Sequence, residues 1–131
     1  MFLLDTHVFW WLLAEPERLS ASHAVILDQA EAEGSPLQIS CYSLWELGQM
    51  AARGRILPPE PLHLWLPSID QDPDIVVHPL TGAVAADAVQ LSDRFPKDPG
   101  DRIIAATARV HGLTLLTADW AIRKSDEVPV A

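Results

Sequence analysis

Short apolar runs alternate with longer stretches of helical pattern along the whole chain, and this alternation limits the possible folds more than any other feature. The runs comprise residues 2–4, 37–40, 75–78 and 113–117, with a further candidate at 128–130. Each is too short for a helix of its own and is typical of a buried strand. Strands that are apolar on both faces and alternate with helices favour a parallel sheet covered on two sides. The sequence therefore predicts a three-layer α/β/α sandwich, in which Pro129 would confine the last run to a sheet edge.

The segments between these runs carry helix start and stop signals. The predicted helices cover residues 6–14, 20–33, 43–54, 62–69, 82–95, 101–111 and 119–124. Thr6 and Thr81 are candidate helix caps, and Ser43 followed by Glu46 has the form of a capping box. Pro67 should limit the length of the helix that contains it, because proline lacks the N–H that a helix interior needs.

Length and composition indicate one globular domain, residues 1–131, whose chain is long enough to bury a sizeable core. Cys41 is the only cysteine, which excludes a disulfide framework and a CxxC zinc site and fits a reducing cytoplasm. The N-terminus lacks the basic region of a signal peptide, and no apolar run approaches membrane-spanning length. We therefore expect a cytoplasmic protein without a membrane partner. The very apolar stretch 62–69, together with Trp10 and Trp11, should lie partly at an interface.

Acidic residues occur where a parallel sheet would bring them to one edge. They follow the first and fourth strands or lie near the starts of helices: Asp5, Glu46, Asp98, Asp101 and Asp119. The carboxyl ends of strands and the N-termini of helices face the same crevice in such sheets. Carboxylates gathered there would repel one another without a cation, and sites made only of oxygen ligands suit Mg²⁺ or Mn²⁺. The pattern predicts a divalent-metal site.

Each acid also has an interpretation that needs no metal. Glu46 could be the capping-box partner of Ser43, and Asp119 could be a turn residue. Asp98 could cap the helix that follows it, with Asp101 favourably placed on the dipole of that helix. Asp5 has the weakest alternative of this kind, because a carboxylate at the end of a buried strand is costly unless it is paired or bound.

Four segments, taken in order and at their spacing, resemble a known family. They are Leu3-Leu-Asp-Thr-His7, Ser43-Leu-Trp-Glu46-Leu, Asp98-Pro-Gly-Asp-Arg-Ile-Ile-Ala-Ala-Thr-Ala108 and Leu113-Thr-Leu-Leu-Thr-Ala-Asp119. Together they resemble the PIN domain, and more narrowly the VapC-type ribonuclease toxins of bacterial toxin–antitoxin pairs. The resemblance spans almost the whole chain.

By position, the resemblance implies that Asp5, Glu46, Asp101 and Asp119 form the catalytic, metal-binding quartet. Asp98 matches an extra acid of a subgroup, with the choice between ligand and helix cap left open, and Thr117 matches a hydroxyl position near the site. The family also implies a five-stranded parallel sheet in the order 3-2-1-4-5. It further implies Mg²⁺- or Mn²⁺-dependent endoribonuclease activity on RNA, a homodimer, and inhibition by a small cognate antitoxin protein.

Two other classes of function remain open from the sequence. Asp5 could be the nucleophile of an aspartyl-phosphate phosphatase or phosphotransfer module, although phosphatases of the haloacid dehalogenase type carry Asp-x-Asp where this chain has His7. His7 could instead touch the acidic site, but a structural histidine is the simpler interpretation. A non-catalytic interaction domain is the second alternative. The formal charge of −9 is unusual for a nucleic-acid enzyme, unless several acids are metal ligands and basic residues such as Arg53 and Arg55 border the site.

Overall fold

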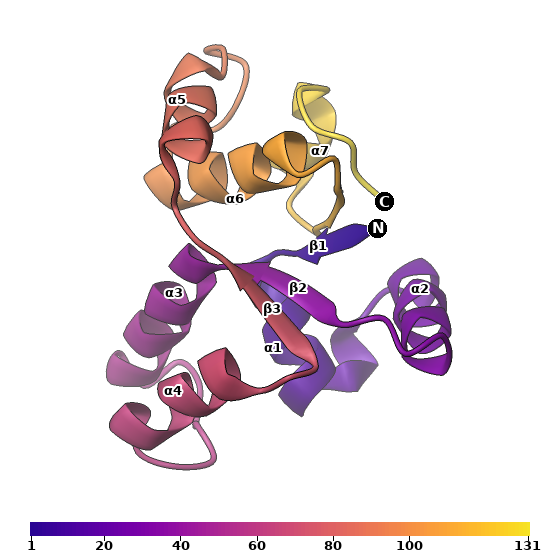
Figure 1. The fold of residues 1–131 in the computed structure, drawn as a ribbon, viewed down its shortest axis with the longest axis vertical. Helices are drawn as coiled ribbons and strands as arrows, with labels where there is room; N and C mark the ends of the chain where they lie inside the picture. The colour runs from indigo at the N-terminus through magenta and orange to yellow at the C-terminus, as the bar shows by residue number, and fades with distance from the viewer.

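The computed structural model describes residues 1–131, and its strands form one parallel sheet in the order β3-β2-β1-β4 (Figure 1). The strands are β1 (Phe2–Leu4), β2 (Leu37–Ser40), β3 (Ile75–His78) and β4 (Thr114–Leu116). All three pairings between neighbours are parallel, and β1 lies between β2 and β4. The four main predicted strands are confirmed, and β1 has an inner position in the sheet although it is only three residues long.

The candidate fifth strand at residues 128–130 is reduced to a single parallel bridge between Leu115 and Val130. The Leu115 N–H donates to the Pro129 carbonyl at 2.8 Å, and the Ala131 N–H donates to the Leu115 carbonyl at 3.1 Å. Pro129 has no N–H of its own to extend the pairing. The sheet therefore has four strands where five were expected, although the bridge lies beyond β4, where the expected order places the fifth.

Seven α-helices and one short 3₁₀ helix connect the strands. They are α1 (Thr6–Ala14), η1 (Pro16–Arg18), α2 (Ala21–Ala32), α3 (Cys41–Ala52), α4 (Leu62–Gln71), α5 (Gly82–Gln90), α6 (Pro99–Val110) and α7 (Trp120–Ser125). Each corresponds to a predicted helix except η1, and Thr81 caps α5 as expected, accepting from the Val84 N–H. None of the helices combines the length and the apolar composition that crossing a membrane requires.

Two helix details differ from the sequence expectations. Ser40, and not Ser43, caps α3, since the Ser40 hydroxyl accepts from the Tyr42 N–H at 3.1 Å. Helix α4 continues four residues beyond Pro67, to Gln71. The loss of one backbone donor at Pro67 is offset by the burial of Trp65 and Ile69 on either side of it.

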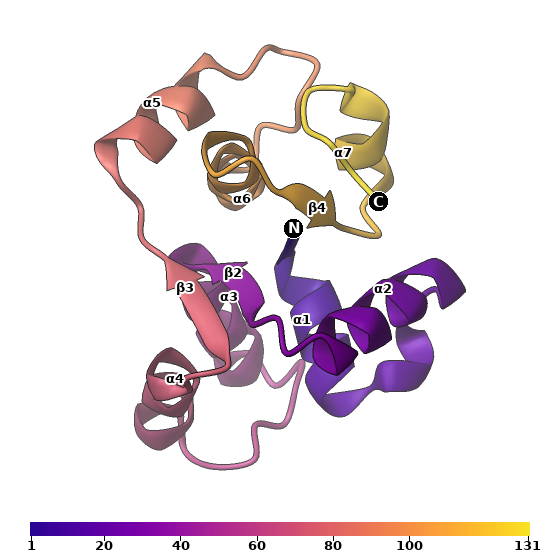
Figure 2. The same cartoon turned by 45° about the vertical axis from the view of Figure 1, so that its right-hand side comes forward.

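Neighbouring residues of the central strands face opposite sides of the sheet, and each side has its own core. Leu3 and Leu115 pack with side chains of α6 and α7, whereas Leu4 and Leu116 pack with side chains of α1, α3 and α4. Helices α5 to α7 lie on one side of the sheet and α1 to α4 on the other (Figures 1 and 2). The predicted three-layer sandwich is confirmed.

The apolar side chains of the stretch 62–69 are divided between the core and the surface, so the expectation that part of it lies at an interface stays a prediction. Trp65 is buried and packs edge-on against the buried Trp10, with ring centroids 5.8 Å apart and an angle of 80° between the rings. Leu64, on the outer side of α4, is 51% exposed. The two tryptophans therefore fasten α4 to α1.

Arg102 holds the connection between α5 and α6 through backbone carbonyl groups. Its side chain donates hydrogen bonds of 2.9 to 3.4 Å to the carbonyl oxygens of Ala88, Leu91, Ser92, Phe95 and Pro96. A guanidinium group has five N–H donors, so one side chain can satisfy this whole set. Arg102 thereby positions the start of α6, which carries two of the five acids.

We predict that Arg102→Met lowers the free energy of unfolding by about 2 kcal/mol or more, because the carbonyl oxygens lose charged donors. Urea denaturation of the purified variant measures this change. Arg94→Met is the matched control, since the Arg94 side chain is 75% exposed and its ion pair with Glu127 is long, at 3.7 Å; we expect it to stay within about 0.5 kcal/mol of the parent. Equal stability of the two variants would contradict a structural role for Arg102.

Candidate active site

Asp5 ends the central strand and begins the first helix. Its carboxylate is only 9% exposed, and Oδ1 accepts a hydrogen bond of 2.8 Å from the Val8 N–H. Asp5 is therefore the N-cap of α1, and the expectation that Thr6 would cap this helix is wrong. Burial raises the pKa of Asp5, while hydrogen bonds from the Thr117 hydroxyl and the Val8 N–H partly oppose that rise.

Asp98 and Asp119 are also helix N-caps. Oδ1 of Asp98 accepts from the Asp101 N–H at 3.0 Å at the start of α6, and Oδ1 of Asp119 accepts from the Ile122 N–H at 3.1 Å at the start of α7. Each of these caps uses Oδ1, whereas an ionised carboxylate has about four acceptor sites on its two oxygens. Capping a helix and binding a cation are therefore compatible roles.

Glu46 is not a capping-box residue, because α3 begins at Cys41, two residues before Ser43, and its N-cap is Ser40. The Thr6 hydroxyl lies 2.5 Å from Oε1 of Glu46 and 2.9 Å from the buried Ser43 hydroxyl. This contact joins the first turn of α1 to the second turn of α3. Burial raises the pKa of Glu46, and the hydrogen bond from Thr6 partly lowers it again.

Four of the predicted acids line a single cleft of about 270 Å³ at the carboxyl edge of the sheet. Its lining residues are Asp5, Thr6, His7, Trp11, Glu46, Asp101, Ile104, Ala118, Asp119 and Ile122. Asp98 lines an adjoining groove that also includes Glu46. The buried hydroxyl of Thr117 accepts from the N–H of Asp119, one of the lining residues, at 3.0 Å. The fold thus brings the acids together from four separate parts of the chain.

The negative charge of the cleft is not balanced by a basic side chain. None of its lining residues is a lysine or an arginine. Partial burial, followed by the charges of Asp98, Asp119, Glu46 and Asp5, raises the pKa of Asp101 to about 7. Burial and the neighbouring carboxylates together therefore leave Asp101 about half protonated at pH 7.

The residues of the cleft suit a hard divalent cation by donor type and by charge. Oxygen ligands are those that Mg²⁺ and Mn²⁺ prefer, and a cation would relieve the repulsion that raises the pKa of Asp101. In their present positions, no three His, Cys, Asp or Glu side chains are gathered closely enough to hold an ion. The carboxylates of the cleft thus fit a metal ion by their chemistry, while the distances between them are longer than those of a bound site.

A contact between Gly100 and Tyr42 sets the two helices that carry Asp101 and Glu46 against each other. A Cβ atom at Gly100, in the first turn of α6, would overlap Cε1 of the Tyr42 ring on α3. Sequence reasoning missed this pair. A glycine in the first turn of a helix is the only local signal, and it does not identify its partner.

Comparison with known proteins agrees with this geometry. Residues 2–128 match the model of the PIN domain, and the chain belongs to the PIN-domain family. It is 39% identical, over 121 residues, to Ribonuclease VapC22 of Mycobacterium tuberculosis, an alignment that covers 92% of this chain and 88% of the relative.

Solved structures share the fold at lower sequence identity. FitAcB from Neisseria gonorrhoeae superposes with a TM-score of 0.70 and 24% identity, covering 99% of this chain and 96% of that one. VapBC2 from Rickettsia felis, bound to a DNA fragment from its promoter, gives a TM-score of 0.70 and 14% identity with the same coverage. The family and the sandwich fold expected from the sequence are both confirmed.

The raised pKa of Asp101 predicts a pH-dependent stability of the metal-free protein. The folded state holds a proton up to a pH of about 7, whereas the unfolded chain releases it near the ordinary value of 3.8, so stability falls as pH rises through this interval. In EDTA at about pH 8, Asp101→Asn should therefore be more stable than the parent by about 1 kcal/mol, a figure discounted for the solvent exposure of the side chain.

Thermal unfolding from about pH 4 to pH 8 measures this difference, which should shrink toward the acidic end. Adding Mg²⁺ at the upper pH should stabilise the parent more than the variant. A constant difference between the two proteins at every pH would contradict the assignment of a near-neutral pKa to Asp101.

Gly100→Ala should lower the free energy of unfolding by about 1–3 kcal/mol, because the added methyl group displaces the Tyr42 ring. Gly82→Ala, at the first position of α5 with open space around its Cβ, is the matched control and should be neutral or slightly stabilising. A double-mutant cycle with Tyr42→Ala tests the contact, since the penalty at Gly100 should largely disappear without the ring.

Proposed function

We propose that this chain is a divalent-metal-dependent endoribonuclease that hydrolyses RNA phosphodiester bonds, with residues 1–131 acting as one nuclease domain. The observation that carries the proposal is the single cleft lined by Asp5, Glu46, Asp101 and Asp119, in which burial and the neighbouring carboxylates raise the pKa of Asp101 to about 7. The similarity to a protein named as a ribonuclease supports RNA as the substrate.

We assign Asp5, Glu46, Asp101 and Asp119 as the catalytic residues and as the ligands of Mg²⁺ or Mn²⁺, with Asp98 as a further oxygen donor beside them. The ion, when bound, lowers the pKa of the attacking water and offsets charge on the phosphate. Asp5 is held rigidly by the Val8 N–H at the end of β1, so it provides a fixed point for the site.

Glu46 is suited to accept the proton of the attacking water. Burial raises its pKa above the usual value of 4.5, which makes it a better base, and the Thr6 hydroxyl at 2.5 Å fixes its orientation. Because water and not the ribose 2′-hydroxyl attacks, the products carry 5′-phosphate and 3′-hydroxyl ends.

We further propose that the protein is the toxin of a toxin–antitoxin pair, forms a homodimer and is inhibited by a small antitoxin protein. The VapC name of the relative supports this role. A structural neighbour from Klebsiella pneumoniae, with a TM-score of 0.66 and 20% identity, is a toxin–antitoxin complex.

The surroundings of Asp5 favour a nuclease over a phosphotransfer enzyme. Asp5 shares its cleft with the carboxylates of Glu46, Asp101 and Asp119, which would repel a phosphate group that no metal ion accompanies. His7 lines the cleft where the phosphatases considered above have a second aspartate.

Asp101→Asn should reduce cleavage of RNA by roughly 100-fold or more, because it removes one charged ligand from the site. Excess EDTA should have the same effect on the parent protein. The assay follows a labelled RNA on a denaturing gel, and the chemistry of the product ends is read by 5′-phosphate-dependent ligation.

The matched control is Asp93→Asn, an exposed carboxylate that lines neither the cleft nor the adjoining groove and should leave activity unchanged. Thermal unfolding verifies that each variant is folded. Full activity in Asp101→Asn or in EDTA would refute the metal-dependent mechanism, and a stable acyl-phosphate on Asp5 would favour the phosphotransfer alternative.

A further inference from the structure

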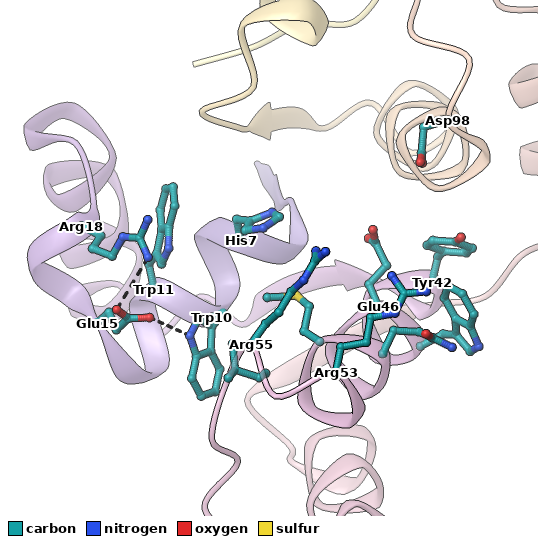
Figure 3. Close-up of a pocket in the computed structure, with 14 residues that line it drawn as sticks. His7, Trp10, Trp11, Glu15, Arg18, Tyr42, Glu46, Arg53, Arg55 and Asp98 are labelled. Atoms are coloured by element: carbon teal, nitrogen blue, oxygen red, sulfur yellow. Dashed lines mark hydrogen bonds and ion pairs between the residues drawn. The ribbon is translucent and has the colours of Figure 1, made fainter.

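The acidic cleft opens into a larger groove of about 540 Å³ that carries a different kind of side chain (Figure 3). The two cavities share His7, Trp11 and Glu46. Beyond these shared residues, the groove is lined by three of the nine basic residues of the chain, Arg18, Arg53 and Arg55. A strongly acidic protein thus places a third of its positive charge beside its candidate active site.

Two of these arginines have no acidic partner. Arg18 lies 3.7 Å from Glu15 and over the Trp11 ring, so its charge is already engaged. Arg53 and Arg55 take part in no ion pair and no side-chain hydrogen bond, and both are exposed at the end of α3. Figure 3 shows Arg55 and Glu46 extending toward the same open space, with Asp98 on its far side.

Trp45 presents an exposed aromatic face in the same groove. It is 56% exposed, and no other lining residue of the groove is a large hydrophobic side chain exposed to this degree. Its ring lies 5.4 Å from that of Tyr42, which in turn packs on Gly100. The Tyr42 ring therefore supports the side chain of Trp45, which directly precedes Glu46 in the chain.

The groove thus combines free guanidinium groups with an exposed ring, next to a cleft of carboxylates. Proteins bind single-stranded nucleic acids with this combination, in which cationic side chains follow the phosphates and aromatic rings stack on the bases. An amphipathic protein segment would require further exposed apolar side chains around Trp45, and the groove offers none of comparable exposure.

We propose that this groove binds the single-stranded RNA that adjoins the cleaved bond, with Arg53 and Arg55 contacting phosphates and Trp45 stacking on a base. The proposal rests on the ribonuclease function proposed above and assigns these three side chains to positioning the substrate. The acidic cleft then acts on the phosphodiester while the groove fixes the neighbouring nucleotides.

Fluorescence anisotropy with a labelled single-stranded RNA of random sequence, about 12 nucleotides long, tests the proposal. The Asp101→Asn protein in Mg²⁺ serves as the parent, so that binding is measured without cleavage. In this background, Arg53→Ala combined with Arg55→Ala should weaken binding and reduce the slope of log K against log salt by about 1.4, or about 0.7 for each lost phosphate contact. Arg94→Ala, outside the groove, should change neither quantity.

Trp45→Ala should weaken binding roughly 5-fold or more, while Trp45→Phe, which keeps an aromatic face, should retain most of the affinity. In proteins with Asp101 intact, the arginine and Trp45→Ala variants should raise KM for RNA with little change in kcat, because they act on binding and not on the reacting atoms. Thermal unfolding confirms that the variants fold.

The results separate this proposal from the proposed function. If the protein with Asp101 intact cuts RNA but the groove variants keep their affinity and salt slope, the assignment of the groove is wrong and the nuclease stands. Unchanged RNA binding with loss of a co-purifying protein in the double arginine variant would also overturn it and assign the groove to a protein partner. If the protein with Asp101 intact neither binds nor cuts RNA, the proposed function itself fails.

Discussion

The carboxylate of Asp5, buried at the exit of the central strand, is the constraint on which the rest of the structure depends. A buried carboxylate is costly unless hydrogen bonds satisfy it. Here the Val8 N–H satisfies it, so α1 begins directly where β1 ends. Because α1 begins there, Thr6 faces α3 and bonds to Glu46. A shift of β1 by one residue would exchange its two faces and break this sequence of contacts.

Helix N-termini explain how so many carboxylates can occupy one edge of the sheet. Asp5, Asp98 and Asp119 each cap a helix, and the N–H groups and dipoles of α1, α6 and α7 stabilise negative charge at that edge. The caps do not remove the repulsion, since burial together with the charges of the neighbouring carboxylates still raises the pKa of Asp101 to about 7. A helix cap and a metal ligand are competing interpretations in the sequence, but a single carboxylate can serve as both.

In this protein, the local arrangement of charged side chains says more about which ligands can bind than the net charge does. The overall value of −9 argues against contact with a polyanion, yet two free arginines lie in a groove that adjoins the acidic cleft. The acidic cleft has no basic lining residue, whereas the groove beside it holds Arg53 and Arg55 without acidic partners. The field that a ligand meets depends on such clustering, because exposed charges beyond a Debye length are largely screened.

The sequence by itself determined the alternation of strands and helices, the approximate helix starts and the positions of the acids, because apolar runs and capping residues act on their immediate neighbours. Only the tertiary structure decided that Glu46 is held by α1. It also decided that Arg102 secures the start of α6, and that Gly100 makes room for Tyr42 between the two helices. These features join residues far apart in the chain, and a pattern of neighbours contains no information about which distant surfaces will meet.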